Sequence, residues 1–180
     1  MDNKIIIKYY KSPVGELILG SYNEQLCLCD WRYRKMRKQI DIRIQTQLNT
    51  SYIEGDSLII KKTIEQLAEY FVGERKEFNI TTLLLGSIFQ KQVWELLQQI
   101  PYGQTRSYLE LSDALGNKKA IRAVAAANGA NAISIIIPCH RIIGSDGKLI
   151  GYAGGLDIKR KLLDLEKTNS GLGVQTRLEL

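Results

Sequence analysis

Ile135-Ile136-Ile137-Pro138-Cys139-His140-Arg141 contains the most informative residues of this chain. The isoleucines indicate a buried strand, and Pro138 is expected to end it. A thiol and an imidazole follow at once, and His140 is the single histidine among 180 residues. Cysteine reacts as the thiolate, and a nearby base or positive charge raises the thiolate fraction. The sequence therefore predicts a nucleophile held in a prepared site.

The composition is typical of a soluble globular protein made of one large domain or two small ones. Hydrophobic residues make up 44% of the chain and charged residues 24%, with a net charge of +6 and a pI of about 9.2. The positive charge favours anionic partners, nucleic acid foremost, although a solvated basic surface would give the same number. No run approaches the roughly 20 apolar residues of a membrane span, and no signal peptide is evident. Three cysteines do not make a disulfide framework, so we expect a reducing, cytoplasmic setting.

The first half reads as a small antiparallel sheet with a helix. Strands are predicted over residues 4–10, 16–22 and 25–31, with a turn at residues 13–15. Apolar residues at helical spacing predict a helix over residues 58–71, which Gly73 ends. Residues 78–85 are expected to form a linker or short strand. The basic stretch over residues 32–38 favours a solvated surface loop, and a contact with DNA or with another protein remains an alternative.

The second half is rich in helices. Two capping boxes, Ser87 to Gln90 and Ser107 to Glu110, open helices that run to about Ile100 and to Gly116. Further elements are predicted as a helix over residues 118–128, a hairpin between Ile142 and Ile150 turning at Asp146-Gly147, and a last helix capped by Asp157 that reaches Glu166. From Thr168 onward the chain is polar.

Two short helices joined by a tight turn, over residues 107–116 and 118–128, are typical of a helix-turn-helix. The second helix carries small residues that can share one side, namely Ala120, Ala123, Ala126 and Ala127, with Arg122 beside them. A narrow face with one long cation suits a DNA minor groove. From these residues alone, close packing of the alanines against another helix is the more common explanation.

Cys27 and Cys29 alternate on a predicted strand and are expected to be buried structural thiols. A metal site is not expected, because the cysteines and the histidine fall in two distant clusters. Tyr108, Asn131 and Glu166 could carry chemistry, but a helix staple, a local turn and a solvated helix residue are the respective structural alternatives. The glycine-rich loop over residues 151–155 suits close approach of backbone to a ligand.

Together these blocks resemble the O6-alkylguanine-DNA alkyltransferases, also called methylated-DNA–protein-cysteine methyltransferases. The resemblance runs from about Phe89 to Glu166 and is looser before that, through Ser12-Pro13-Val14-Gly15. The blocks that carry it are Phe89-Gln90-Lys91-Gln92-Val93-Trp94, Pro101-Tyr102-Gly103, Ser107-Tyr108, Ala120-Ile121-Arg122-Ala123-Val124, Asn131, residues 137–141 and Gly151-Tyr152-Ala153-Gly154-Gly155.

The resemblance implies an architecture. An α/β ribonuclease-H-like domain with a small antiparallel sheet and a helix would occupy residues 1–85. A mainly α helix-turn-helix DNA-binding domain would occupy residues 86–169. The polar, glycine-containing composition of residues 170–180 predicts a flexible tail.

The resemblance also implies catalytic roles. Cys139 would accept the alkyl group, His140 would take its proton through a water, and Glu166 would orient His140. Asn131 would brace the turn that carries this network. Tyr108 would donate to the leaving guanine and crowd the adjacent phosphate as the nucleotide turns out of the duplex.

The remaining residues would bind DNA and the flipped base. Arg122 would fill the vacated place in the base stack, and the alanine face would lie in the minor groove. Ile142, Tyr152, Ala153 and Gly154 would form the base pocket.

The resemblance implies direct-reversal repair in a single turnover, with no cofactor and no metal. The partner would be double-stranded DNA containing alkylated bases, without membrane or obligate protein partner, and the protein is expected to be a monomer. Members often have proline where Ala132 follows Asn131, so a less rigid loop is expected here. A lesion-binding protein of the same fold without transfer is one alternative, and a Cys-His hydrolase is another.

Overall fold

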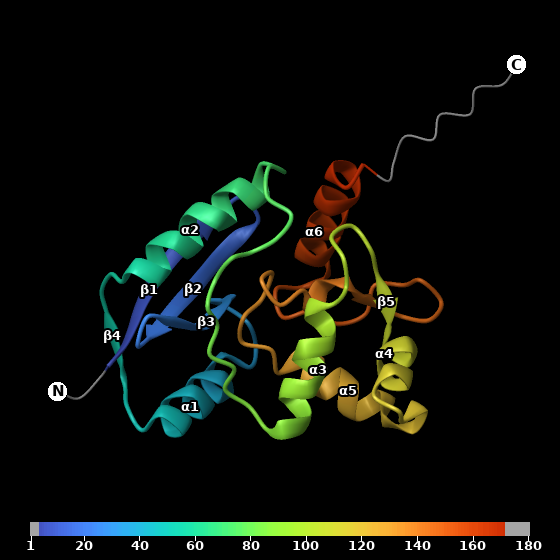
Figure 1. The fold of residues 1–180 in the computed structure, drawn as a ribbon, viewed down its shortest axis with the longest axis horizontal. Coiled ribbons are helices and arrows are strands. Elements are labelled where there is room, and N and C mark those ends of the chain that lie inside the picture. Colours follow the sequence, from blue (N-terminus) through green and yellow to red (C-terminus); the bar gives the residue numbers. More distant parts are fainter. Residues whose placement is uncertain (1–3, 172–180) are drawn as a thin grey trace, which may run out of the picture.

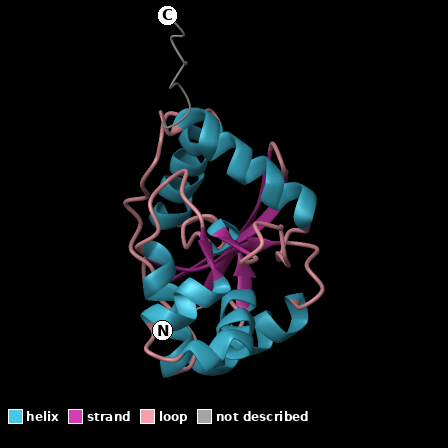
Figure 2. Ribbon diagram, turned by 90° about the vertical axis from the view of Figure 1, so that its right-hand side faces the viewer, coloured by secondary structure: helices cyan, strands magenta, loops and turns pink. Residues whose placement is uncertain are grey.

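The computed structural model describes residues 4–171 (Figure 1). A four-stranded sheet with two helices forms the first half, and a cluster of helices forms the second. Figure 2 shows helices on both sides of the strands. Most of the predicted flexible tail, from residue 172 onward, lies outside the described residues. Within residues 4–171, no helix is long and apolar enough to cross a membrane.

The sheet contains the three predicted antiparallel strands and one parallel strand. These are β1 (Ile5–Ser12), β2 (Gly15–Tyr22), β3 (Gln25–Trp31) and β4 (Tyr52–Glu54), in the order β3-β2-β1-β4. β4 pairs parallel with β1, so the sheet is mixed rather than purely antiparallel. At three residues, β4 is too short to give a periodic sequence signal.

Two helices cover opposite faces of this sheet. The predicted helix α2 (Leu58–Phe71) begins at Ser57, whose side chain accepts from the Ile60 amide, and its apolar stripe packs on the core that includes Leu17 and Leu19. Helix α1 (Arg37–Leu48) packs Ile40 and Ile44 against the opposite face. The sequence did not predict α1, which begins inside the basic stretch expected to be a loop.

The predicted linker over residues 78–85 runs along β3. Leu26 donates its amide to the Thr81 carbonyl, and its own carbonyl accepts from the Leu83 amide. A single bridge, Leu26 to Thr82, results, so the segment adds a bridge to the sheet but forms no strand of its own.

The second half contains four α-helices: α3 (Ile88–Gln98), α4 (Tyr108–Ala114), α5 (Ile121–Gly129) and α6 (Leu156–Asn169). Both predicted capping boxes are present, at the starts of α3 and α4. The helix predicted over residues 118–128 begins instead with a 3₁₀ turn, Lys118–Ala120, and only then becomes α5.

Two predictions near the end of the chain were wrong. Residues 142–150 do contain a turn, in which the Gly147 amide donates to the Gly144 carbonyl. However, β6 (Ile142–Ile143) pairs parallel with β5 (Arg106–Ser107) and forms no hairpin with Ile150. Gly155 stands at the N-cap position of α6, so Asp157 lies inside the first turn, where its charge suits the helix dipole. The helix also continues past Glu166 and Thr168 to Asn169.

The isoleucine run is a turn rather than the predicted strand. Ile133 forms a parallel bridge with Cys29, so the preceding residues extend the sheet next to β3. Ile135 then adopts a left-handed φ of 72°, which is unusual for a β-branched residue, and the Ile137 amide donates back to the Ile133 carbonyl at 2.9 Å. This pairing with β3 overrides the local preference for an extended chain. Pro138 then leads into the 3₁₀ turn Cys139–Arg141.

Candidate active site

Cys139 lies on that 3₁₀ turn with only 3% of its surface exposed. Burial raises the pKa of the thiol, and a hydrogen bond from Asn131 partly offsets this effect. Successive side chains on a 3₁₀ turn point in different directions. His140 therefore does not stack on its neighbour, and any action of the imidazole on the thiol is indirect.

His140 and Glu166 form a buried pair. Nε2 of His140 lies 2.8 Å from Oε1 of Glu166, and both side chains are fully buried. Burial lowers the pKa of His140 more than Glu166 raises it, so the imidazole is neutral near pH 7. The alternative in which Glu166 is a solvated helix residue is excluded.

Glu166 forms hydrogen bonds with residues from both halves of the molecule. Its carboxylate accepts from the Tyr70 hydroxyl on α2 at 2.8 Å, from the Gly103 amide at 3.1 Å and from the Arg141 guanidinium at 2.8 and 3.0 Å. Burial alone would raise the pKa of Glu166, but the hydrogen bonds and charges of His140 and Arg141 outweigh it and hold the pKa well below the usual range. The carboxylate therefore remains ionised. Sequence reasoning did not identify Tyr70 or Arg141 as parts of this network.

This arrangement fixes the tautomer of His140. An ionised carboxylate can only accept, so the proton of the neutral ring belongs on Nε2. Nδ1 is then an acceptor, and it is buried without a hydrogen-bond partner among residues 4–171. The ring thus presents one free basic nitrogen, held in place from its opposite side.

Asn131 holds the turn that leads to Cys139. Its Nδ2 donates to the Ile137 carbonyl at 3.0 Å, and its Oδ1 accepts from the Ile133 amide at 2.9 Å. These bonds span the whole turn. The Cys29 amide also donates to the Ala132 carbonyl at 2.8 Å, which ties the residue after Asn131 to β3.

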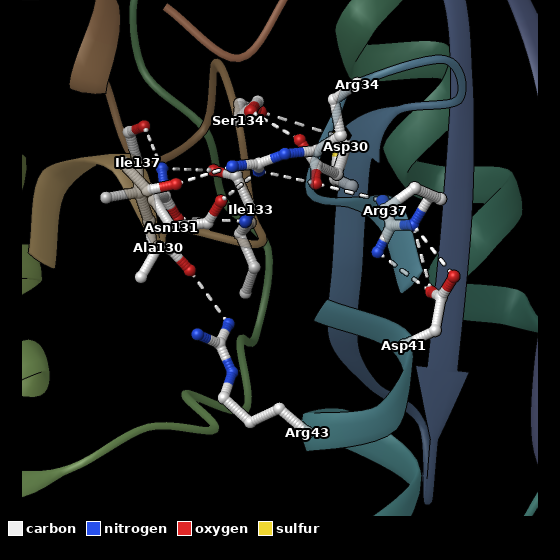
Figure 3. Close-up of polar contacts among 12 residues, drawn as sticks. Asp30, Arg34, Arg37, Asp41, Arg43, Ala130, Asn131, Ile133, Ser134 and Ile137 are labelled. Atoms are coloured by element: carbon white, nitrogen blue, oxygen red, sulfur yellow. Dashed lines mark hydrogen bonds and ion pairs between the residues drawn. The ribbon is translucent and has the colours of Figure 1, made fainter. Parts of the chain in front are cut away.

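A second buried carboxylate, Asp30, lies on the other side of this turn (Figure 3). It accepts from Arg34 at 2.8 Å, from Arg37 at 2.9 Å and from the Ser134 hydroxyl at 3.1 Å. The prediction of a solvated loop over residues 32–38 was therefore wrong at Arg34 and Arg37, which are turned inward. Arg34 and Arg37 lie only four and seven positions from Asp30, but Ser134 lies 104 positions away, so no local signal shows that this cluster reaches the second half of the chain.

Tyr108 is half-buried at the start of α4. Burial raises the pKa of its hydroxyl, and the nearby Cys139 thiol raises it further. A hydrogen bond with Asn128 opposes these effects without cancelling them, so the hydroxyl keeps its proton at neutral pH.

The loop over residues 151–155 closes the site from another side. Tyr152 packs edge-on between His140, at a ring distance of 6.3 Å, and Trp31 of β3, at 6.0 Å. A Cβ added to Gly154 would lie 2.8 Å from the Trp31 ring, so the loop backbone rests directly on this tryptophan. Ala153 is half-buried in the same loop. The sequence did not predict a contribution from Trp31.

Ile142 is fully buried, and its carbonyl accepts from Lys159 of α6. Lys159 also donates to the carbonyl of Ile150 at 2.7 Å, and burial lowers its pKa to about 8. One ammonium group thus fixes the segments before and after the turn at Asp146. Sequence reasoning also missed this lysine.

Helix α5 exposes part of the predicted alanine face. Arg122, Ala123 and Ala126 are exposed, and Ala120 is half-buried. The inclusion of Ala127 was wrong, because Ala127 is 2% exposed and its carbonyl accepts from the Trp94 indole at 2.8 Å. The exposed side of α5 is therefore narrower than predicted, with Arg122 at its edge.

Two family models together match most of the chain. Residues 5–84 match the model described as 6-O-methylguanine DNA methyltransferase, ribonuclease-like domain. Residues 88–168 match the model described as 6-O-methylguanine DNA methyltransferase, DNA binding domain. The predicted order of a ribonuclease-like domain followed by a helical DNA-binding domain is confirmed.

Individual relatives agree. A methylated-DNA–protein-cysteine methyltransferase of Methanosarcina acetivorans is 43% identical over 157 residues, covering 87% of this chain and 95% of the relative. The protein of that name from Mycobacterium tuberculosis H37Rv is 53% identical over 162 residues, covering 88% and 90%. Among solved structures, Mycobacterium tuberculosis OGT in complex with DNA superimposes with a TM-score of 0.78 at 40% identity, covering 91% of this chain and 94% of that one.

Proposed function

This chain belongs to the 6-O-methylguanine DNA methyltransferase family, and from that premise we propose that it repairs DNA by moving alkyl groups from O6 of guanine onto Cys139. One observation carries the proposal. A buried thiol is followed directly by a neutral imidazole whose Nε2 is fixed on Glu166 and whose Nδ1 has no hydrogen-bond partner among residues 4–171. This is the arrangement that a general base for a buried nucleophile requires.

The reaction is a single displacement at the alkyl carbon. A water between the Cys139 thiol and Nδ1 of His140 would pass the thiol proton to the imidazole, and Glu166 would stabilise the resulting imidazolium. The thiolate then forms the S–C bond as the C–O6 bond breaks, and the electron pair leaves with the guanine oxygen. Guanine gains a proton from the Tyr108 hydroxyl. The proton that His140 took from the thiol then returns to the Tyr108 oxygen, so both residues end in their starting protonation states. The thioether has no easy route back, so each molecule acts once.

The target atom lies inside the duplex, so the base must be flipped out at a cost of a few kcal/mol. The exposed edge of α5 suits this task, because Ala123 and Ala126 allow close approach to a minor groove. Arg122 beside them would occupy the vacated stack, and its cation would offset part of the cost. The loop carrying Tyr152, Ala153 and Gly154, together with the backbone at Ile142, would receive the base.

A nucleophilic thiol requires a reducing compartment, and all three cysteines are free and buried. We therefore place the activity in the cytoplasm, with access to the chromosome.

The test compares wild type with Cys139→Ser on a duplex oligonucleotide containing O6-methylguanine. Wild type should remove methyl groups in a burst that stops when lesions repaired equal protein added, whereas Cys139→Ser should bind the duplex and repair nothing. Binding without repair by wild type would instead indicate a lesion-binding protein, and continued turnover would indicate an ordinary enzyme.

A further inference from the structure

We propose that Arg34, although it lies in the first domain, is a positioning residue for the reaction of Cys139. Its guanidinium, fixed on Asp30, holds the backbone turn that leads from α5 to the acceptor. This inference rests on the proposed function, since it assigns a residue to the same reaction.

Arg34 makes a three-point connection between the domains (Figure 3). Nη1 donates to Asp30 at 2.8 Å and to the Asn131 carbonyl at 3.0 Å, and Nη2 donates to the Gly129 carbonyl. Only 3% of the Arg34 side chain is exposed. A buried planar fork can hold several acceptors at fixed relative positions, which a flexible ammonium cannot do.

The same turn is held at its far end by Asp30. Oδ1 of this fully buried carboxylate accepts from the Ser134 hydroxyl at 3.1 Å, while Oδ2 accepts from Arg34 and Arg37. The backbone from Gly129 to Ser134 is therefore pinned at its start through Arg34 and at its end through Asp30. Arg43 of α1 adds a bond to the Ala130 carbonyl at 2.8 Å.

The pinned turn connects directly to the thiol. The Asn131 side chain donates to the Ile137 carbonyl, and the same carbonyl accepts from the Cys139 amide at 2.8 Å. A shift of the Asn131 backbone would therefore move the segment before Cys139. It would also move the Asn131 side-chain amide, which forms a hydrogen bond with the Cys139 thiol.

The turn also begins at the C-terminal end of α5, the helix that carries Arg122. Gly129 is the last residue of α5, where carbonyls lack helical partners and a cation is favourable. Arg34 thus fixes the end of the DNA-binding helix and the start of the path to Cys139 with one group. Displacement of an attacking atom by about 1 Å can slow a reaction by about 100-fold, so the rate of transfer should depend on this connection.

The experiment measures the single-turnover rate of Cys139 methylation at saturating lesion DNA, together with the Kd for the same duplex. The variants are Arg34→Gln and Arg34→Lys, each checked for native circular dichroism at the assay temperature. The matched control is Arg32→Gln, which removes the same charge two residues earlier from a side chain that pairs with Glu16 and stacks on Tyr9. We expect Arg34→Gln to react about 10- to 100-fold more slowly with an unchanged Kd, Arg34→Lys to fall between it and wild type, and the control to match wild type.

A pH profile of the rate separates positioning from general loss of stability. The ionisable groups whose charge acts on the thiol are Cys29 and Asp30 of β3, Arg34, Tyr108 of α4, Tyr152 of the loop and Lys159 of α6. The Arg34 charge lowers the pKa of the Cys139 thiol, so its removal raises that pKa. The rising limb of the rate should therefore move to higher pH in Arg34→Gln and stay in place in Arg34→Lys and in the control.

Equal rates for wild type and a folded Arg34→Gln protein would overturn the inference while leaving the proposed function intact. If Arg34→Gln does not fold, Arg34→Lys decides, and a wild-type rate in that variant would overturn the inference. Absence of methylated Cys139 in wild type itself would overturn the proposed function and this inference together.

Discussion

Two buried carboxylates join the two halves of this protein. One binds the side chains around His140, and the other binds the groups that fix a backbone turn. Glu166, on α6, binds the side chains of His140, Arg141 and Tyr70. Asp30, at the end of β3, binds Arg34, Arg37 and Ser134. Both have no exposed surface. Glu166 holds a titratable ring, whereas Asp30 holds the groups that fix a backbone turn.

The two carboxylates are therefore expected to affect the reaction in different ways, one through proton transfer and the other through the position of the turn. The charge of Glu166 acts on the protonation of His140, and through it on the thiol. The charge of Asp30 raises the pKa of the Cys139 thiol while the charge of Arg34 lowers it, so the two oppose each other there, and the main effect of Asp30 on the reaction passes through the location of the turn at Asn131. Substitutions at the two carboxylates should therefore lower the rate for different reasons and by different amounts.

The largest effect is expected from Glu166→Gln. The amide can still accept from His140, but it cannot stabilise an imidazolium, and it leaves Arg141 buried without a counter-charge. We expect single-turnover transfer to slow roughly 100-fold or more, and the free energy of unfolding to fall by about 3 kcal/mol. Rapid-quench kinetics and urea unfolding measure the two quantities. Transfer at the wild-type rate would remove Glu166 from the reaction.

Asp30→Asn should destabilise the protein by a similar amount but slow the reaction less. Arg34 and Arg37 lose their shared counter-charge in a buried place, which costs about 3 kcal/mol. The base at His140 is untouched, so we expect transfer to slow by only about tenfold, through displacement of the turn. The same kinetic and urea experiments apply. A loss of rate as large as that of Glu166→Gln would break the distinction between the two carboxylates.

Acid should weaken the Glu166 region selectively. The folded-state pKa of Glu166 lies below its ordinary value of 4.5, so the carboxylate contributes stability above that pH and loses it as the pH falls. The folded-state pKa of His140 lies below 6.5, so below that pH the unfolded chain gains a proton that the folded protein resists. Both groups therefore destabilise the folded protein as the pH falls, and we expect the free energy of unfolding to decrease from pH 7 toward pH 4. Glu166→Gln removes the carboxylate that raises the pKa of His140, so the fall between about pH 6.5 and pH 5 should be steeper in this variant, and a shallower fall there would contradict the assignment.

The smallest effect is expected at an exposed carboxylate with equally close geometry. Glu69 and Arg75 approach within 2.5 Å, but their side chains are 44% and 29% exposed. Solvent screens such a pair, so Glu69→Gln should change the free energy of unfolding by about 0–1 kcal/mol and leave transfer unchanged. Urea unfolding of this variant beside the other two measures how much of their effect comes from burial.

The sequence predicted those elements whose signals are local. The capping boxes at Ser87 and Ser107 each rest on residues three positions apart, and the three antiparallel strands rest on short segments separated by turns. The adjacency of Cys139 and His140 was also visible in the local sequence. The roles assigned to Glu166 and Asn131 came from family resemblance and remain proposals, now with geometry to support them.

The elements that were missed depend on distant partners. In α1, Ile40, Ile42 and Ile44 alternate as in a strand, and only Ile40 and Ile44 are buried while Ile42 is 54% exposed. Pairing with Cys29 converts the isoleucine run into a turn, and Asp30 draws two arginines of an apparently solvated stretch inward. The arginines lie near Asp30 in the chain, but the contacts of Asp30 and Arg34 with Gly129, Asn131 and Ser134 join residues 95 to 104 positions apart.

Transfer of an alkyl group to Cys139 can be tested by the intact mass of the protein after incubation with a duplex containing O6-methylguanine, followed by peptide mapping. We expect one added methyl group, located on Cys139, with one lesion repaired per molecule. An unchanged mass despite tight, lesion-selective binding, or a methyl group on Cys27 or Cys29, would contradict it.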